Sequence, residues 1–197
     1  MSARICHPPL SREEFCHQIS QVLHAHAIDK FILVAHSYGT VLATHLLHST
    51  ISPRISSLIL IDAVPFLLHL PPVAHNFVHR VPTTANEFQL QFFASHDSGI
   101  SHALSRHFFW AQNILWKEEL EGRRVAVVLS GRDLIVDSLA CWRYLTGLEE
   151  VERDLWCSPD GQLTVLWNAD LDHSQVFDRR GSRVPVVGLI EEFVGGE

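Results

Sequence analysis

Short apolar runs that recur at wide intervals constrain the fold of this chain more than any other sequence feature. They are rich in valine, isoleucine and leucine, and they are Phe31–Ala35, Ser57–Asp62, Val125–Leu129 and Leu163–Trp167. Uninterrupted runs of this kind predict strands that are buried on both faces, as in a parallel sheet. Helical patterns separate most of the runs. The alternation predicts an α/β fold whose parallel sheet has about four strands.

The clearest helical signal follows Ser11, because Ser11 and Glu14 have the spacing of a capping box and apolar residues follow at helical intervals. We expect this helix to cover residues 11–27. Further covering helices are expected at residues 38–49, 137–145 and 185–193. Gly147 is placed to end the second of these.

Residues 63–122 depart from this alternation. They are rich in proline, histidine and phenylalanine, and they carry helical patterns at residues 86–93 and 101–120. We interpret them as a helical cap inserted into a single domain that spans residues 1–197.

Charge and hydropathy exclude several classes of function. The formal net charge is −7, and lysine and arginine form no cluster, which argues against a nucleic-acid partner. The longest apolar stretch, residues 58–73, is interrupted by aspartate and proline and falls short of the ~20 apolar residues of a membrane span. We expect no membrane-spanning segment.

The cysteines and the first residues bear on the compartment. Cys6, Cys16, Cys141 and Cys157 are widely spaced and lack the C-x-x-C pattern, so we expect free thiols. Residues 1–9 contain no apolar run of the kind found in signal peptides. These features predict a cytoplasmic protein.

Ser37 is the strongest candidate for a functional residue. The string Ala35-His36-Ser37-Tyr38-Gly39 directly follows a predicted strand and begins a predicted helix. A sharp turn at this point lifts the serine hydroxyl away from the sheet and leaves the backbone N–H of Tyr38 facing a developing oxyanion. We expect small residues two positions before and after the serine because backbone passes close there. His36 is expected to shape the substrate pocket, and the alternative is that Ser37 merely caps the helix.

From residue 11 to its end, the chain resembles the α/β-hydrolase superfamily. The resemblance rests on the turn at Ser37 and on two later loops in the family order of nucleophile, acid and histidine. It implies that Asp133, which follows a strand and a glycine turn, is the acid. It also implies that His173, in the loop after the last predicted strand, is the general base.

Other residues compete for these roles. Asp137 is an alternative acid, although it stands where the next helix needs an N-cap, and Asp133 itself is also compatible with an ordinary turn. Asp62, at the end of its strand, either lines the pocket or binds backbone.

Histidine spacing also permits a metal site. His45 with His48, and His75 with His79, share a helix face, but no further ligand pattern accompanies either pair. We expect neither a metal nor a cofactor.

The family's sheet has strands before the segment at which this sequence begins, and an earlier loop supplies a second oxyanion donor. We therefore expect the domain to be N-terminally incomplete. The strand at Phe31 is then expected to pair with a partner chain or with a missing N-terminal segment.

The resemblance implies a serine hydrolase that cleaves a carboxylic ester through Ser37, His173 and Asp133. Apolar side chains of the expected cap favour an apolar or lipid-like acyl group: Phe66, Leu67, Leu68, Phe77, Phe88, Phe92, Phe93, Phe108, Phe109 and Trp110. The alternatives are a non-catalytic binding or regulatory module, an inactive fragment of a longer hydrolase, and thioester hydrolysis or acyl transfer by the same residues.

Overall fold

Five strands form one sheet in the order β1-β2-β3-β5-β4 in a computed structural model, which describes residues 9–196. The strands are β1 (Phe31–His36), β2 (Ile55–Ile61), β3 (Arg124–Ser130), β4 (Leu155–Cys157) and β5 (Leu163–Asn168). Strands β1, β2, β3 and β5 pair in parallel with one another, whereas β4 pairs antiparallel with β5. The predicted parallel α/β sheet is confirmed, and β4 is one strand more than we expected.

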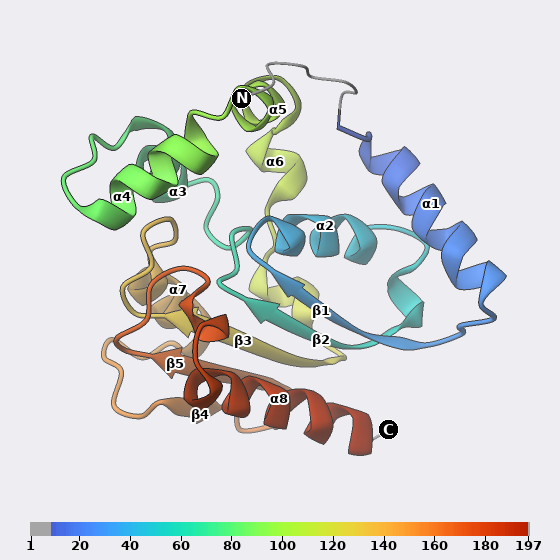
Figure 1. Ribbon diagram of the computed structural model, residues 1–197. Helices are drawn as coiled ribbons and strands as arrows, with labels where there is room; N and C mark the ends of the chain where they lie inside the picture. Colours follow the sequence, from blue (N-terminus) through green and yellow to red (C-terminus); the bar gives the residue numbers. More distant parts are fainter. Residues whose placement is uncertain (1–8, 197) are drawn as a thin grey trace.

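The sheet is buried on both faces, as the continuous apolar runs predict. Along β2, Leu58 and Leu60 pack on one face with helices α2 (Tyr38–Leu47) and α7 (Ser138–Thr146). Ile59 and Ile61 point to the other face, where α8 (Arg180–Gly195) covers them. Figure 1 shows α2 and α8 on opposite sides of the strands.

Local signals explain the ends of several helices. Helix α1 (Arg12–Ala25) begins with both bonds of the predicted capping box, from Ser11 N to Glu14 at 2.9 Å and from Glu14 N to Ser11 Oγ at 3.2 Å. Helix α7 ends at Gly147, whose φ of 75° suits glycine. Helix α8 is longer than expected, with Pro185 inside it.

The segment of residues 63–122 is helical but more fragmented than expected. Its elements are α3 (Pro72–Ala74), η2 (His75–His79), α4 (Ala85–Leu90), η3 (Gln91–Ser95), α5 (Ser98–His107), α6 (Trp110–Asn113) and η4 (Lys117–Leu120). The helix predicted over residues 101–120 is broken first at Phe108 and Phe109, whose backbone is extended. It is broken again after Asn113, where Ile114 and Leu115 are buried in the core and the Leu115 N–H donates to the carbonyl of Pro65 at 3.1 Å. Figure 1 shows α3, α4 and α5 grouped away from the sheet.

Two short turns complete the described elements, η1 (Ser52–Arg54) before β2 and η5 (Gln175–Phe177) before α8. Strand β1 ends the sheet, and no strand in residues 9–196 pairs with its outer side. The side chain of Val34 on this strand is 42% exposed. A partner for this edge therefore stays a prediction.

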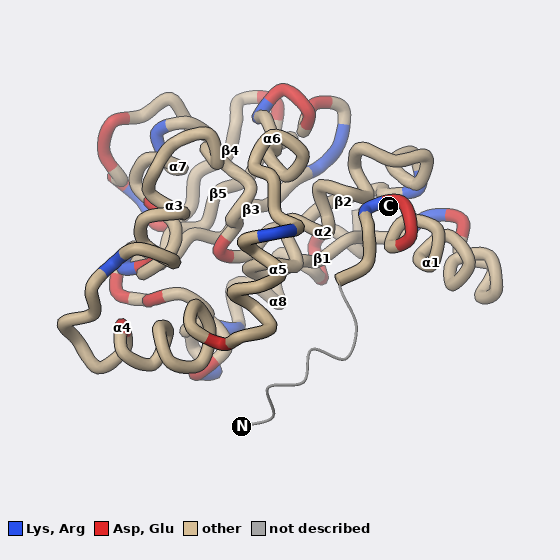
Figure 2. The backbone as a smooth tube through the Cα atoms, turned by 90° about the horizontal axis from the view of Figure 1, so that it is seen from above, with Lys and Arg blue, Asp and Glu red and all other residues tan. Residues whose placement is uncertain are grey.

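Charged residues are scattered over the backbone, and Figure 2 shows the region of α3, α4 and α5 mostly free of them. Among the described helices, none combines the length and the apolar character that a membrane crossing needs. Cys16, Cys141 and Cys157 are free thiols, and Cys6 lies outside the described residues.

Candidate active site

Ser37 occupies a strained turn between β1 and α2. Its φ of 53° and ψ of −127° place it in a region that a residue with a side chain rarely adopts. The turn is held by the Ser37 N–H, which donates to the carbonyl of Ile61 at 3.0 Å, and by the hydroxyl of Thr40, which donates to the Ser37 carbonyl at 2.5 Å. The Ser37 side chain makes no capping hydrogen bond, so the alternative of a capping serine is not supported.

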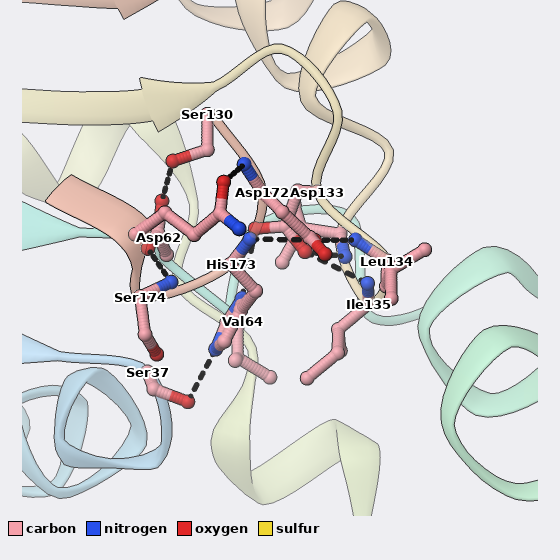
Figure 3. A network of polar contacts seen from close by, with 12 residues as sticks. Ser37, Asp62, Val64, Ser130, Asp133, Leu134, Ile135, Asp172, His173 and Ser174 are labelled. Carbon is pink, nitrogen blue, oxygen red and sulfur yellow. Dashed lines mark hydrogen bonds and ion pairs between the residues drawn. The ribbon is translucent and has the colours of Figure 1, made fainter. Parts of the chain in front are cut away.

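The Ser37 hydroxyl points to the imidazole of His173, and that imidazole reaches Asp133 on its other side (Figure 3). The distance from Ser37 Oγ to His173 Nε2 is 2.7 Å, and that from His173 Nδ1 to Asp133 Oδ2 is 2.8 Å. Because an ionised carboxylate can only accept, Nδ1 must donate to Asp133, which leaves Nε2 free to accept the serine proton. The structure thus brings the three predicted residues into one hydrogen-bonded series.

Backbone donors fix the orientation of Asp133. Its Oδ1 accepts hydrogen bonds from the N–H groups of Ile135 and Val136, at 2.7 and 2.9 Å, while Oδ2 faces His173. Asp137 instead caps α7 by accepting from the Ala140 N–H at 3.0 Å, as the sequence suggests for an N-cap.

The loops that carry Asp133 and His173 run side by side. The Gly131 N–H donates to the carbonyl of Asn168 at 2.8 Å, and the Arg132 N–H donates to the carbonyl of Leu171 at 2.9 Å. A Cβ atom at Gly131 would lie 2.6 Å from the carbonyl oxygen of Ala169, a distance that no real contact tolerates. Glycine is therefore required for this approach of the two loops.

Negative charge around His173 favours its protonated form. Burial opposes protonation, but the hydrogen bond and the charge of Asp133, with the charges of Asp62 and Asp172, outweigh burial and raise the pKa of His173 above its ordinary value of 6.5. An imidazole of this kind is a strong acceptor for a serine proton.

Tyr38 and His36 flank Ser37. The backbone N–H of Tyr38, at the first position of α2, finds no backbone acceptor among the described residues. The centre of the Tyr38 ring lies 6.3 Å from the centre of the Phe108 ring. Phe108 belongs to the segment between β2 and β3. The ring of His36 lies 5.5 Å from that of His173.

One expectation about the turn is not supported at Gly39. Apart from its chain neighbours and the nearby backbone of its own helix, a Cβ atom at Gly39 would meet no described atom within 4 Å, so contact with other parts of the chain does not explain the glycine two positions after Ser37.

Sequence reasoning missed the part played by Asp172. Its Oδ1 accepts from the backbone N–H groups of Leu134 and His173, at 2.9 and 2.6 Å, and its Oδ2 accepts from Asn86 of α4 at 3.3 Å. Its place directly before His173 was the only sequence signal, and a local pattern does not identify partners so far away in the chain.

Three ligand atoms, one each from Asp62, Asp133 and His173, lie within 4.8 Å of one another, a spacing that suits a metal ion. The oxygens of both carboxylates already accept hydrogen bonds from protein donors, which a cation would have to displace. Of the histidines with helical spacing, His45 Nε2 contacts Asn113 at 2.7 Å and His48 Nε2 contacts Glu119 at 2.5 Å.

A cavity of about 600 Å³ lies beside Asp133, lined by residues of α3, η2 and the start of α7. Ser37 and His173 are not among its lining residues. Of the apolar residues expected to line an acyl slot, Phe66 and Leu68 are buried in the core, whereas Phe92, Phe93 and Phe109 are more than half exposed.

Comparisons with known proteins agree with the fold. The family model described as the alpha/beta hydrolase fold matches residues 4–172. The chain belongs to this family, so the resemblance found in the sequence is confirmed. Comparison with curated proteins gives no match.

Similar solved structures include AbyA5, with 18% identity, a TM-score of 0.59 and coverage of 94% of this chain and 50% of AbyA5. The meta-cleavage product hydrolase CumD from Pseudomonas fluorescens IP01 has 17% identity, a TM-score of 0.55 and coverage of 98% and 75%. Est816, described as an N-acyl homoserine lactone degrading enzyme, has 17% identity, a TM-score of 0.56 and coverage of 91% and 74%. This chain thus spans half the length of AbyA5 and about three quarters of the other two.

Proposed function

We propose that this chain is a serine hydrolase that cleaves a carboxylic ester, with Ser37 as nucleophile, His173 as general base and Asp133 as the acid that orients the imidazole. The observation that carries the proposal is the unbroken series of hydrogen bonds from Ser37 Oγ through His173 to Asp133, at 2.7 and 2.8 Å. A serine hydroxyl is a weak nucleophile by itself, and an adjacent imidazole held by a carboxylate is what activates it.

In the first half of the reaction, Ser37 Oγ attacks the ester carbonyl carbon while its proton passes to His173 Nε2. The carbonyl oxygen becomes an oxyanion, which the backbone N–H of Tyr38, the first residue of α2, stabilises together with the partial positive charge at the start of that helix. When the tetrahedral intermediate collapses, the alcohol leaves with the proton from His173. The acyl group stays on Ser37.

In the second half, water replaces the serine as nucleophile. His173 takes a proton from the water, hydroxide adds to the acyl carbon, and the acid is released as the proton returns to Ser37. Asp133 accepts the Nδ1 hydrogen throughout and stabilises the imidazolium.

We further propose that the acyl group is apolar. Two observations support this: Phe108 lies 6.3 Å from the Tyr38 ring, ring centre to ring centre, and few charged residues occur in the region of α3, α4 and α5 (Figure 2). The same triad also suits thioesters and acyl transfer, so the substrate must be established with a panel of acyl compounds.

Labelling with a fluorophosphonate probe tests the proposal, because the probe forms a stable bond only with an activated serine. The unsubstituted chain should be labelled, and Ser37→Ala and His173→Ala should each abolish the signal. Ser105→Ala removes an exposed serine of α5 and serves as the matched control, which should be labelled at the normal rate.

The circular dichroism spectrum of each variant should match that of the unsubstituted chain. A folded chain that remains unlabelled would reject the hydrolase proposal and favour a non-catalytic binding module. If the Ser37→Ala variant is still labelled, Ser37 is not the nucleophile.

A further inference from the structure

A second buried carboxylate lies at the candidate site. Asp62 directly follows β2, its residue is 1% exposed, and its φ of 47° is unusual for a residue other than glycine. Its backbone N–H donates to the carbonyl of Val128 on β3 at 2.9 Å, so the strained residue is anchored in the sheet.

The Asp62 carboxylate connects the ends of all four parallel strands. Its Oδ1 accepts from the hydroxyl of Ser130, the last residue of β3, at 2.7 Å. Its Oδ2 accepts from the N–H of Ser174, in the loop after β5, at 2.8 Å, and lies 3.4 Å from Nε2 of His36, the last residue of β1. Figure 3 shows the Ser130 and Ser174 bonds next to the Ser37 and His173 pair.

No lysine or arginine among the described residues forms an ion pair with Asp62. Burial alone would raise the pKa of this carboxyl, but the hydrogen bonds from His36 and Ser130, the charge of His173 and the Ser174 N–H together lower it below its ordinary value. The carboxylate is therefore ionised at neutral pH. A buried charge of this kind needs a function or a strong network to offset its desolvation.

Asp62 acts on His173 in two ways. Its bond to the Ser174 N–H holds the residue after His173 at a φ of 70°, a left-handed conformation that serine rarely adopts without support. Its negative charge also lies within 4.8 Å of the imidazole. The other titratable groups that face His173 are Asp133, Asp172 and His36.

We propose that Asp62 is a positioning residue for His173, which fixes the backbone of the histidine loop and supplies a second negative charge that favours the imidazolium. The inference rests on the proposed function, because positioning His173 matters for catalysis only if His173 is the base. It goes beyond the series Ser37, His173 and Asp133, which does not require this carboxylate.

Asp62→Asn is the informative substitution because it removes the charge and keeps the shape. The asparagine oxygen can still accept from the Ser174 N–H, and its amide can donate to Ser130 Oγ. Asp170→Asn is the matched control, since Asp170 lies in the same loop as His173 but is exposed and pairs with Arg132 at 2.5 Å.

The first measurement is the pKa of His173 by NMR titration of histidine labelled with ¹³C, its signal being assigned by comparison with His173→Gln. Asp62→Asn should lower this pKa by about one pH unit, and Asp170→Asn should leave it unchanged. An unchanged pKa in Asp62→Asn, or an equal fall in Asp170→Asn, would overturn the inference. The titration needs no turnover, so its failure is distinct from that of the proposed function, which shows as no labelling of the unsubstituted chain.

The second measurement is the rate of fluorophosphonate labelling against pH. Labelling needs neutral His173. A lower pKa of His173 in Asp62→Asn should therefore shift the acid limb of the pH–rate profile to lower pH by about one unit. The rate above the limb should fall by up to about tenfold, because one unit of pKa corresponds to a factor of ten in proton affinity and the rate follows part of that change. A lower rate with an unmoved limb would mean a merely structural role and would reject the proposal.

If Asp62→Asn does not fold, the unsubstituted chain and Ser130→Ala provide the test. The amide proton signal of Ser174 should follow the protonation of Asp62 below about pH 4. Ser130→Ala removes one donor and should move this midpoint upward. If the midpoint of the Ser174 signal does not change in Ser130→Ala, the hydrogen bond from the Ser174 N–H to Asp62 does not report on this carboxylate, and the inference is contradicted.

Discussion

The Nε2 atom of His173 lies 2.7 Å from the Oγ atom of Ser37, although 136 residues separate the two in the chain. Ser37 follows β1 and His173 follows β5, and these strands are separated in the sheet by β2 and β3. They meet because the carboxyl ends of parallel strands share one edge, where the loops fold over the sheet.

Asp133→Asn should nearly abolish labelling by fluorophosphonate. An amide in place of the carboxylate can hold His173 in the wrong tautomer and gives the imidazolium no opposite charge, which costs about 10⁴-fold in related chemistry. Asp137→Asn is the matched control, because asparagine caps a helix as well as aspartate does. If Asp133→Asn and Asp137→Asn lose labelling equally, Asp133 is not established as the acid of the triad.

The labelling rate of the unsubstituted chain should rise with pH over a limb centred above pH 6.5. His173 must be neutral to accept the serine proton, and its surroundings raise its pKa above the ordinary 6.5. For the same reason, protonated His173 stabilises the fold below pH 6.5, and this contribution is lost as pH rises through the folded pKa. The free energy of unfolding of the unsubstituted chain should therefore exceed that of His173→Gln by more at pH 6 than at pH 9. A labelling limb centred below pH 6 would contradict the prediction.

The strands were predictable because burial on both faces of a parallel sheet demands continuous apolar residues, as Leu58 to Ile61 illustrate. Strand β4 was not, since its three residues are held by pairing with β5 and carry no pattern of their own. The second break in the helix of residues 101–120, after Asn113, likewise depends on the burial of Leu115 in the core. Local patterns do not contain such contacts.

In the candidate site too, some features follow from local sequence patterns and others depend on contacts between distant parts of the chain. Ser37, Asp133 and His173 were chosen because each follows a predicted strand in the family order, and the structure places them in contact. The bonds that Asp62 and Asp172 make to the histidine loop depend on how close the loops come in space. The spacing of residues in the sequence does not predict these distances.

Phe108→Ala should reduce the preference for longer acyl chains. The Phe108 ring lies beside Tyr38, so its loss should lower kcat/KM for p-nitrophenyl hexanoate about tenfold relative to the acetate, the effect of a lost apolar contact of one or two methylene groups. Phe93→Ala removes a phenylalanine that is 72% exposed and should leave the ratio unchanged. A ratio that changes equally in both variants would place the acyl group elsewhere.

Gly131→Ala should destabilise the fold and slow labelling. Its Cβ would lie 2.6 Å from the carbonyl oxygen of Ala169, so the loops of Asp133 and His173 must separate. We expect a loss of about 1–3 kcal/mol in the free energy of unfolding, measured by urea denaturation. Gly188→Ala, inside α8 with open space around it, should instead stabilise the protein by about 0.5–1 kcal/mol, and a stable Gly131→Ala would disprove the required approach.

Thr40→Val should cost more stability than the isosteric change at its buried neighbour Thr44. The hydroxyl of Thr40 donates to the carbonyl of Ser37 at 2.5 Å and accepts from the N–H of Val64 at 3.1 Å, so it ties the strained turn to the chain that follows β2. Valine would leave the Val64 N–H without its partner, which costs about 1–3 kcal/mol, while the Ser37 carbonyl would keep the hydrogen bond from the Thr40 backbone N–H at 2.9 Å. The Thr44 hydroxyl donates only to the carbonyl of Thr40, at 3.0 Å within the same helix, so Thr44→Val should cost less than about 1 kcal/mol.

Urea denaturation of both variants measures the difference, provided that their m-values agree with that of the unsubstituted chain. Thr40→Val should also slow fluorophosphonate labelling, because the Ser37 turn loses one of the bonds that hold its φ of 53°. Thr44→Val should be labelled at nearly the normal rate, since its hydroxyl does not touch the turn. If the two variants lose equal stability and are labelled equally fast, the turn does not depend on the Thr40 hydroxyl, and the strain at Ser37 must be held by the backbone bonds from the Ser37 N–H to Ile61 and from the Thr40 N–H to the Ser37 carbonyl.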